Sequence, residues 1–205
     1  MQVLAVDNAL IIVCKPAGLL SVPGRLPENK DCLITRLQLE FADALTVHRL
    51  DQVTSGLMVF ARSKSAQAHL SAQFAQRQVH KRYTAWVEGS VQDDSGSIDM
   101  PLICDWPNRP RQKVDFELGK SALTHWRVLE RSSAGAAART LLELTPVTGR
   151  SHQLRLHLAT IGHPIVGDDF YGAQPAERVC LHASELALSH PDTGAALLWQ
   201  SAAPF

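Results

Sequence analysis

The apolar residues near the start of the chain are spaced as in short β-strands. Residues 3–6 and 10–14 predict two strands joined at Asp7-Asn8, a pair of residues that favours turns. Residues 57–61 predict a further strand that is apolar along its length. Six more strands are predicted at residues 83–87, 114–118, 123–129, 140–144, 179–188 and 195–199.

Three other segments repeat their apolar residues with the period of an α-helix. The first follows Asp31, its expected N-cap; the second follows Ser63 and runs to about residue 76; the third starts at Ser151. Residues 19–30 predict an ordered surface loop, and residues 132–138 predict a flexible turn. Because strands outnumber helices and do not alternate with them regularly, we predict an α+β fold with a mixed, mostly antiparallel sheet.

The length of 205 residues suits one sizeable domain, or a single core divided into two lobes. The first residues do not form a signal peptide, and no apolar run approaches the length that spans a bilayer, so we expect a cytoplasmic protein with no membrane partner. The four cysteines are scattered and lie in no zinc-binding pattern, which predicts reduced, structural thiols.

The formal net charge is zero, which by itself argues against a nucleic-acid partner. The charges are nevertheless segregated along the sequence. Residues 52–87, 106–114 and 144–167 contain neither Asp nor Glu. Their basic residues are Arg62, Lys64, Arg77, Lys81 and Arg82 in the first range, Arg109, Arg111 and Lys113 in the second, and Arg150 and Arg155 in the third. Such a distribution permits one basic face, although ordinary solvated surface explains the same charges equally well.

The polar, irregular segment at residues 48–56 leads directly into an apolar strand. A segment of this kind can place a side chain at the rim of a sheet, which makes Asp51 a candidate catalytic carboxylate. Taken alone, an aspartate in this position more often caps a turn.

Residues 149–155 form a second candidate site. If a helix starts near Ser151, its first amides and Arg150 favour an anion such as phosphate. Arg155 lies on the same face as His152, and a partly buried arginine needs a carboxylate, for which Asp51 is available. The alternative is that Arg150 and Arg155 are surface charges and that His152 is structural.

Three blocks in register resemble the RluA-type pseudouridine synthases. They are His48-Arg49-Leu50-Asp51 with Thr54-Ser55-Gly56, Lys81-Arg82-Tyr83, and Thr148-Gly149-Arg150-Ser151-His152-Gln153-Leu154-Arg155 with residues 162–168. Residues 15–25 also look like the opening loop of this family, so the resemblance covers nearly the whole chain. It implies a sheet of two lobes with a central active-site cleft, and the isomerisation of uridine to pseudouridine in RNA.

The family pattern implies roles for five residues. Asp51 matches the aspartate that breaks the N-glycosidic bond, by attack at C6, by attack at C1′ or by removal of a sugar proton. Tyr83 matches the tyrosine that packs on the uracil and is a candidate for removing the C5 proton. Arg155 matches the partner of the aspartate, Ile165 supports the base from beneath, and Arg49 fills the space of the flipped nucleotide.

The residues expected to hold the RNA lie in the opening loop, in the Pro-rich loop and at the start of the third helix. They are Arg25, Arg109, Arg111, Lys113, Arg150 and His152. Residues 101–110 resemble a short dual-specificity subgroup, which implies a tRNA anticodon arm and a hairpin of 23S ribosomal RNA as partners.

We also expect a monomer with one catalytic domain at residues 1–205, no N-terminal S4-type RNA-binding domain, no metal and no cofactor. The chain lacks the clustered carboxylates of a nuclease, the G-x-S-x-G of a serine hydrolase and the glycine-rich loop of a nucleotide-binding enzyme. The remaining alternative is a non-catalytic RNA-binding or ribosome-maturation factor, which the presence of Asp51, Tyr83 and Arg155 disfavours.

Overall fold

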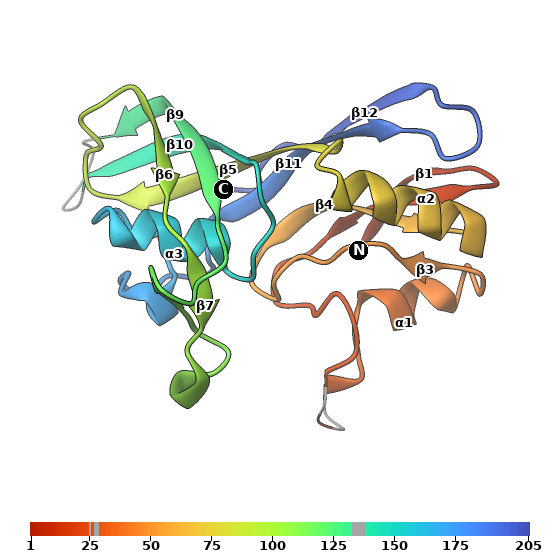
Figure 1. Cartoon of the computed structure of the whole chain (residues 1–205), viewed down its shortest axis with the longest axis horizontal. Helices are drawn as coiled ribbons and strands as arrows, with labels where there is room; N and C mark the ends of the chain where they lie inside the picture. Colours follow the sequence, from red (N-terminus) through yellow and green to blue (C-terminus); the bar gives the residue numbers. More distant parts are fainter. Residues whose placement is uncertain (25, 27–28, 133–137) are drawn as a thin grey trace. The chain divides into compact units, whose positions relative to one another are not determined.

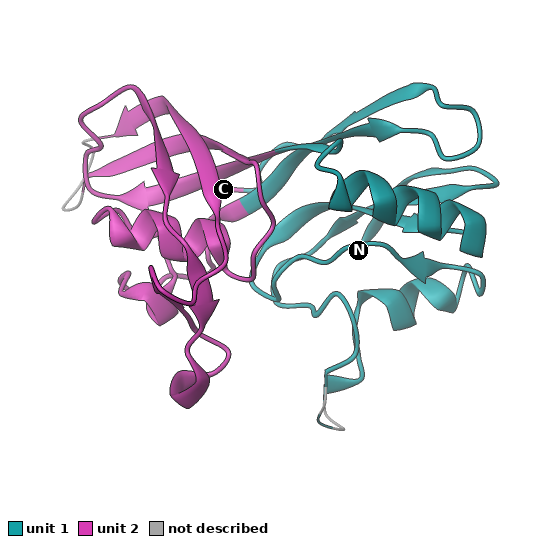
Figure 2. Cartoon of the chain, in the orientation of Figure 1, with its two compact units in different colours: residues 1–81, 182–204 teal, residues 82–181, 205 magenta. Residues whose placement is uncertain are grey.

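A computed structural model of the chain describes residues 1–24, 26, 29–132 and 138–205 (Figure 1). The chain divides into two compact units (Figure 2). Unit 1 comprises Met1–Lys81 and His182–Pro204, and unit 2 comprises Arg82–Leu181 with Phe205. Arg25 lies outside the described residues. So do most of the predicted flexible turn and part of the predicted opening loop.

Unit 1 is built on a sheet in which β1, β2, β4 and β11 are neighbours in that order, while β3 pairs with β4 and β12 pairs with β11. The strands are β1 (Gln2–Val6), β2 (Leu10–Lys15), β3 (Leu45–Thr46), β4 (Ser55–Ala61), β11 (Leu181–Ser189) and β12 (Ala196–Gln200). The pair of β4 and β11 is parallel, and the other pairs are antiparallel. The predicted turn at Asp7 is confirmed, because its Oδ1 accepts hydrogen bonds from the amides of Ala9 and Leu10.

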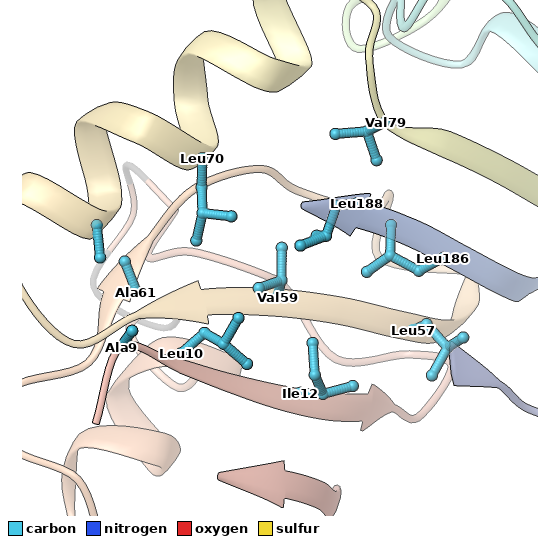
Figure 3. Packing of buried hydrophobic residues seen from close by; sticks show 11 residues of the cluster. Ala9, Leu10, Ile12, Leu57, Val59, Ala61, Leu70, Val79, Leu186 and Leu188 are labelled. Carbon is cyan, nitrogen blue, oxygen red and sulfur yellow. The ribbon is translucent and has the colours of Figure 1, made fainter. Parts of the chain in front are cut away.

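The core of unit 1 lies between this sheet and the helix α2 (Lys64–Ala75). Every residue of β4 is buried, which explains why residues 57–61 are all apolar. Leu70 on α2 points toward the sheet, where Val59 and Leu188 lie (Figure 3). The predicted cap is confirmed, since the Ser63 hydroxyl accepts a hydrogen bond from the amide of Ala66 at 3.1 Å.

The first helix begins later than predicted. Its N-cap is Cys32 and not Asp31, and α1 spans Leu33–Gln38. The hydroxyl of Thr35 accepts a hydrogen bond from the Cys32 amide at 3.1 Å. The N-cap amide, which has no partner within the helix, is thereby hydrogen-bonded. The Asp31 carboxylate instead pairs with Arg36.

Unit 2 contains an antiparallel sheet in the order β5, β10, β9, β6, and a separate hairpin of β7 and β8. The strands are β5 (His80–Glu88), β6 (Ser95–Asp99), β7 (Leu102–Cys104), β8 (Gln112–Val114), β9 (Leu123–Ser132) and β10 (Arg139–Pro146). The helices are α3 (Gln153–Thr160) and the short 3-10 turns η2 (Trp106–Asn108) and η3 (Asp169–Tyr171). The β7–β8 hairpin, residues 102–114, projects from the rest of unit 2 with η2 at its tip (Figure 1).

In unit 2 the predictions missed the strands β6 and β7, and one predicted strand is wrong. The sequence did not predict β6, because Ser95-Gly96-Ser97 has the composition of a turn. Gly96 lies beneath Trp126, and a Cβ there would come within 2.6 Å of the indole, so glycine is needed for this strand pairing. The strand predicted at residues 114–118 is wrong: Asp115 Oδ1 accepts from the amides of Glu117 and Leu118 and makes a turn.

The predicted α+β fold with a mostly antiparallel sheet is confirmed. All four cysteines are free thiols. Within the described ranges, no helix has both the length and the apolar character that crossing a membrane requires.

Candidate active site

Asp51 lies in the connection that enters β4. Its carbonyl accepts a hydrogen bond from the amide of Thr54 at 3.1 Å, which closes a tight turn immediately before the buried strand. The Asp51 side chain is half-buried. The expectation of a polar turn at the rim of a sheet is thereby confirmed.

Backbone atoms on both sides of Asp51 are held by the opening loop of the chain. The ammonium of Lys15, which is fully buried, donates to the carbonyl of Gln52 at 3.1 Å. The same carbonyl accepts from the amide of Gly18 at 2.8 Å. On the other side, the Ser21 hydroxyl donates to the carbonyl of Leu50 at 2.6 Å and accepts from its amide at 3.0 Å. These contacts fix the main chain next to the candidate carboxylate.

His48, the first residue of the polar segment, is a neutral structural acceptor. Its Nε2 accepts from the amide of Val59 at 3.0 Å, and its ring stacks on Phe74 with centroids 4.5 Å apart. Burial, together with the charge of Lys81, lowers the pKa of His48 from 6.5 to about 3. An uncharged imidazole can therefore keep accepting this hydrogen bond at neutral pH.

The start of β4 is fixed against β11 by a close contact between backbones. Gly56 has a φ of +115°, and a Cβ at this position would lie 2.3 Å from the carbonyl oxygen of Ala183. Beside it, the Ser55 hydroxyl lies 2.8 Å from Nδ1 of the buried His182, whose Nε2 lies 3.1 Å from the Ser201 hydroxyl. Strand β4 consequently places Asp51 with little freedom relative to the sheet of unit 1.

Tyr83 and Ile165 lie on the sheet of unit 2. Tyr83 is half-buried on β5, opposite Leu144 of β10. Ile165 is fully buried and forms an isolated bridge with Val87 of the same strand β5. The sheet therefore holds both residues in fixed register.

Arg155, on α3, forms a buried bidentate ion pair with Asp168. Its Nε donates to Oδ2 at 2.6 Å and its Nη2 donates to Oδ1 at 2.7 Å. The rings of Phe170 and Tyr171 lie 5.5 and 5.2 Å from the guanidinium carbon, measured to the ring centroids. The prediction that a partly buried Arg155 needs a carboxylate is confirmed, and Asp168 is one partner that the sequence did not identify.

The third helix begins two residues later than predicted. Its N-cap is His152, which has a left-handed backbone with a φ of +53°, and the helix itself starts at Gln153. The His152 imidazole is buried, and its Nδ1 lies 2.8 Å from the Tyr171 hydroxyl. Arg150 is exposed as expected, and its Nε donates to the carbonyl of Ser121 at 3.0 Å.

The predicted RNA-binding cations of the Pro-rich loop lie in the β7–β8 hairpin. All three are exposed. Arg109 lies over the ring of Trp106 at 4.8 Å, and Arg111 lies over Phe170 at 5.4 Å. Lys113 is 3.4 Å from the carboxylate of Asp115, which offsets part of its charge.

The predicted site residues fall in both units. Asp51 and the exposed Arg49 belong to unit 1, whereas Tyr83, Arg155 and Ile165 belong to unit 2. Their assembly into one site stays a prediction. Sequence reasoning missed the contacts made by Lys15, Ser21, Asp168 and His182; for Asp168 a signal existed, because it is the first acidic residue after the acid-free segment that contains Arg155.

The profile of the family described as RNA pseudouridylate synthase matches residues 9–160. The chain belongs to this family. The matched segment includes Asp51, Tyr83 and Arg155, and the predictions of the family, of an isomerase and of an RNA substrate are confirmed.

Relatives of this RNA pseudouridylate synthase match along its whole length. The dual-specificity RNA pseudouridine synthase RluA of Yersinia pestis is 50% identical over 210 residues, which covers 100% of both chains. The protein of the same name from Escherichia coli strain K12 is 47% identical over 209 residues, covering 100% of this chain and 94% of the relative.

Solved structures agree with the fold of this synthase. Human RNA pseudouridylate synthase domain containing 1 is 27% identical and has a TM-score of 0.83, covering 99% of this chain and 83% of the human one. Human RNA pseudouridylate synthase domain containing 4 is 26% identical with a TM-score of 0.77, covering 98% and 88% respectively.

Proposed function

We propose that this RNA pseudouridine synthase has two kinds of substrate, a tRNA anticodon arm and a hairpin of 23S ribosomal RNA. The proposal rests on the full-length identity of about half to relatives named as dual-specificity enzymes. The resemblance of residues 101–110 to the same subgroup supports the choice of these two RNAs.

The proposed reaction is an isomerisation in which the base is released and rejoined. The bond between C1′ and N1 of uridine breaks, a bond between C1′ and C5 forms, and the hydrogen on C5 is exchanged for one on N1. Atoms and electrons balance within the substrate, so the reaction needs no redox partner. We accordingly expect neither a cofactor nor a metal.

Asp51 is the proposed catalytic carboxylate and starts the cleavage of the glycosidic bond. Arg155 pairs with this carboxylate and keeps it ionised and oriented. The Asp168 ion pair supports this role, because it fixes two of the guanidinium nitrogens and restricts the direction of the rest. Tyr83 packs on the uracil and removes the C5 proton in the late step.

The target uridine must leave its stack before Asp51 can reach it, at a cost of roughly a few kcal/mol. Arg49 occupies the space that the nucleotide leaves, and its exposure on the loop beside Asp51 supports this role. Stacking on Tyr83 over the apolar floor of Ile165 recovers about 1–3 kcal/mol.

The RNA backbone is held by the basic residues of the hairpin together with Arg25 and Arg150, while the buried His152 bonds Tyr171 at the start of α3. The exposure of Arg109 and Arg111 supports this role, because neither forms an ion pair with a carboxylate among the residues that the structure describes. Both units act as one catalytic domain, and we expect the enzyme to work as a monomer in the cytoplasm.

The proposal is tested by tritium release from 5-tritiated uridine in separate tRNA and 23S ribosomal RNA transcripts. We expect release from both transcripts with the wild-type enzyme and none with Asp51→Asn. Release from one transcript alone would contradict the dual specificity. Unchanged release by Asp51→Asn would contradict the role of Asp51.

A further inference from the structure

The ring of Phe170 is close to two arginines that belong to different parts of unit 2. Arg111, from the β7–β8 hairpin, lies 5.4 Å from the centroid of its ring. Arg155, from helix α3, lies 5.5 Å from the same centroid. One ring of the 3-10 turn η3 therefore contacts a cation proposed to bind RNA and a cation proposed to orient the catalytic carboxylate.

The next residue, Tyr171, joins the same two elements by hydrogen bonds. Its hydroxyl accepts from the backbone amide of Gln112, at the start of β8, at 3.0 Å. The same hydroxyl lies 2.8 Å from Nδ1 of His152, the N-cap of α3. Its ring packs on Arg155 at 5.2 Å. Phe170 thus contacts the β7–β8 hairpin and Arg155. Tyr171 contacts the same hairpin, Arg155 and the N-cap of α3.

The charges around Phe170 are unequal. Arg155 is neutralised by Asp168, two residues before Phe170. Arg111 is exposed and, in the described part of the chain, has no carboxylate partner. The charge of Arg111 is thus the uncompensated one at the ring, and a phosphate beside Arg111 would attract its guanidinium and change the contact with Phe170. A bound RNA backbone would consequently change the balance of forces on the ring that also holds Arg155.

We propose that Phe170 and Tyr171 are positioning residues, which make the orientation of Arg155 depend on the docking of RNA on the β7–β8 hairpin. The proposal rests on the proposed functions of Arg155 and of the hairpin. Part of the binding energy of the RNA backbone is then used to orient a group that acts on the reacting uridine, which raises the rate of the bound complex rather than its affinity alone.

The first test measures the single-turnover rate at saturating RNA, together with RNA affinity, for Phe170→Leu and Tyr171→Phe. We expect the rate to fall by roughly tenfold in each, because a small misplacement of an orienting group is costly. Phe170→Tyr keeps the ring and should restore the wild-type rate. Phe41→Leu is a matched control, since Phe41 carries Arg62 over its ring at 5.8 Å in unit 1.

The second test is a double-mutant cycle with Arg111→Ala. In the wild-type background, this substitution should lower both RNA affinity and the saturated rate. In the Phe170→Leu background, it should lower affinity alone, because the connection to Arg155 is already lost. Rate effects that simply multiply would overturn the proposal.

The outcomes also separate this proposal from the role of Arg155 itself. Thermal melts first establish that each variant is folded at the assay temperature, so that a purely structural role leaves the saturated rate unchanged. If folded Phe170→Leu and Tyr171→Phe react at the wild-type rate while Arg155→Lys is slow, only the positioning proposal is wrong. If Arg155→Lys also reacts at the wild-type rate, both proposals are wrong.

Discussion

Arg155 and Asp168 form a bidentate ion pair in which the side chains are only 4% and 1% exposed. An ion pair of the same geometry joins Arg36 to Asp31, with contacts of 2.7 and 2.6 Å, on the surface of unit 1. The chain thus contains a buried and an exposed ion pair of the same geometry. The two pairs should contribute differently to the free energy of unfolding.

Replacing Asp168 with Asn should destabilise the protein strongly. The guanidinium of Arg155 would stay buried and lose a charged partner, and breaking a buried pair in this way costs about 3–5 kcal/mol. Urea unfolding measures the change. Asp31→Asn is the control and should leave the unfolding midpoint almost unchanged, because water and salt screen the exposed pair. Equal losses in the two variants would contradict the prediction.

Lys15→Met should weaken both stability and catalysis. The ammonium of Lys15 donates to the carbonyls of Pro16, Leu19 and Gln52. A buried carbonyl that loses its donor lowers the free energy of unfolding by about 1–3 kcal/mol. The segment that carries Asp51 would also loosen, so the saturated rate should fall more than RNA affinity. Lys64→Met, on the exposed face of α2, is the control. A stable variant with full activity would show that the ammonium is dispensable.

His48 should make stability depend on pH in the acidic range. The unfolded histidine takes up a proton near pH 6.5, whereas the folded one has a pKa of about 3 because it is buried. Between these values the unfolded state binds more protons, so the free energy of unfolding falls as pH decreases, by at most about 1.4 kcal/mol per pH unit.

The His48 contribution is isolated by comparing the wild type with His48→Gln, whose amide oxygen can still accept from the Val59 amide. Between pH 7 and pH 5, the variant should lose about 1–2 kcal/mol less than the wild type. Chemical denaturation at a series of pH values measures both curves. Parallel curves would mean that the folded His48 is protonated like an ordinary histidine.

Tyr83→Phe should bind RNA like the wild type and fail in the late step. The ring that packs on the base is retained, but the hydroxyl proposed to take the C5 proton is absent, and general base catalysis is worth about 10²–10⁴-fold. Tritium release measures this step, and filter binding measures affinity. Tyr83→Leu should in addition lose affinity, because it removes the stacking ring. Normal tritium release by Tyr83→Phe would exclude the acid–base role.

Arg109→Ala and Arg111→Ala should weaken the binding of every RNA and make it less sensitive to salt. The slope of log affinity against log salt concentration is negative, and each phosphate contact that is lost makes it shallower by about 0.7–0.9. Lys113→Ala should have a smaller effect, because Asp115 already offsets its charge. Arg127→Ala, on β9, is the control, since Arg127 pairs with Glu143. Unchanged slopes in the two arginine variants would place the RNA elsewhere.

The sequence predicted those elements in which local pattern and tertiary burial agree. In β10, Thr140, Leu142 and Leu144 alternate with less buried residues, as the period of a strand facing one core requires. The cap of α2 was equally predictable, because the Ser63 hydroxyl binds an amide only three residues away. Such features need no knowledge of distant parts of the chain.

The sequence failed where a distant residue decides the local conformation. The start of α3 is displaced because His152 adopts a left-handed backbone while hydrogen-bonding to Tyr171, which lies 19 residues later. Lys15 shows the same limit in the site, because lysine is normally a surface residue and its three carbonyl partners are brought together only by the fold. The family motifs identified Arg155, but its contact with Asp168 depends on the path of the loop between them.

The loop that carries Asp51 is held largely by main-chain atoms, through the carbonyl of Gln52 and through the carbonyl and amide of Leu50. None of these contacts involves the side chains of Arg49 or Val53. We therefore expect that both positions can be exchanged without displacing the aspartate. Directed variation at Val53, which has no proposed part in flipping the nucleotide, offers a way to alter which uridine the enzyme accepts while its chemistry is preserved.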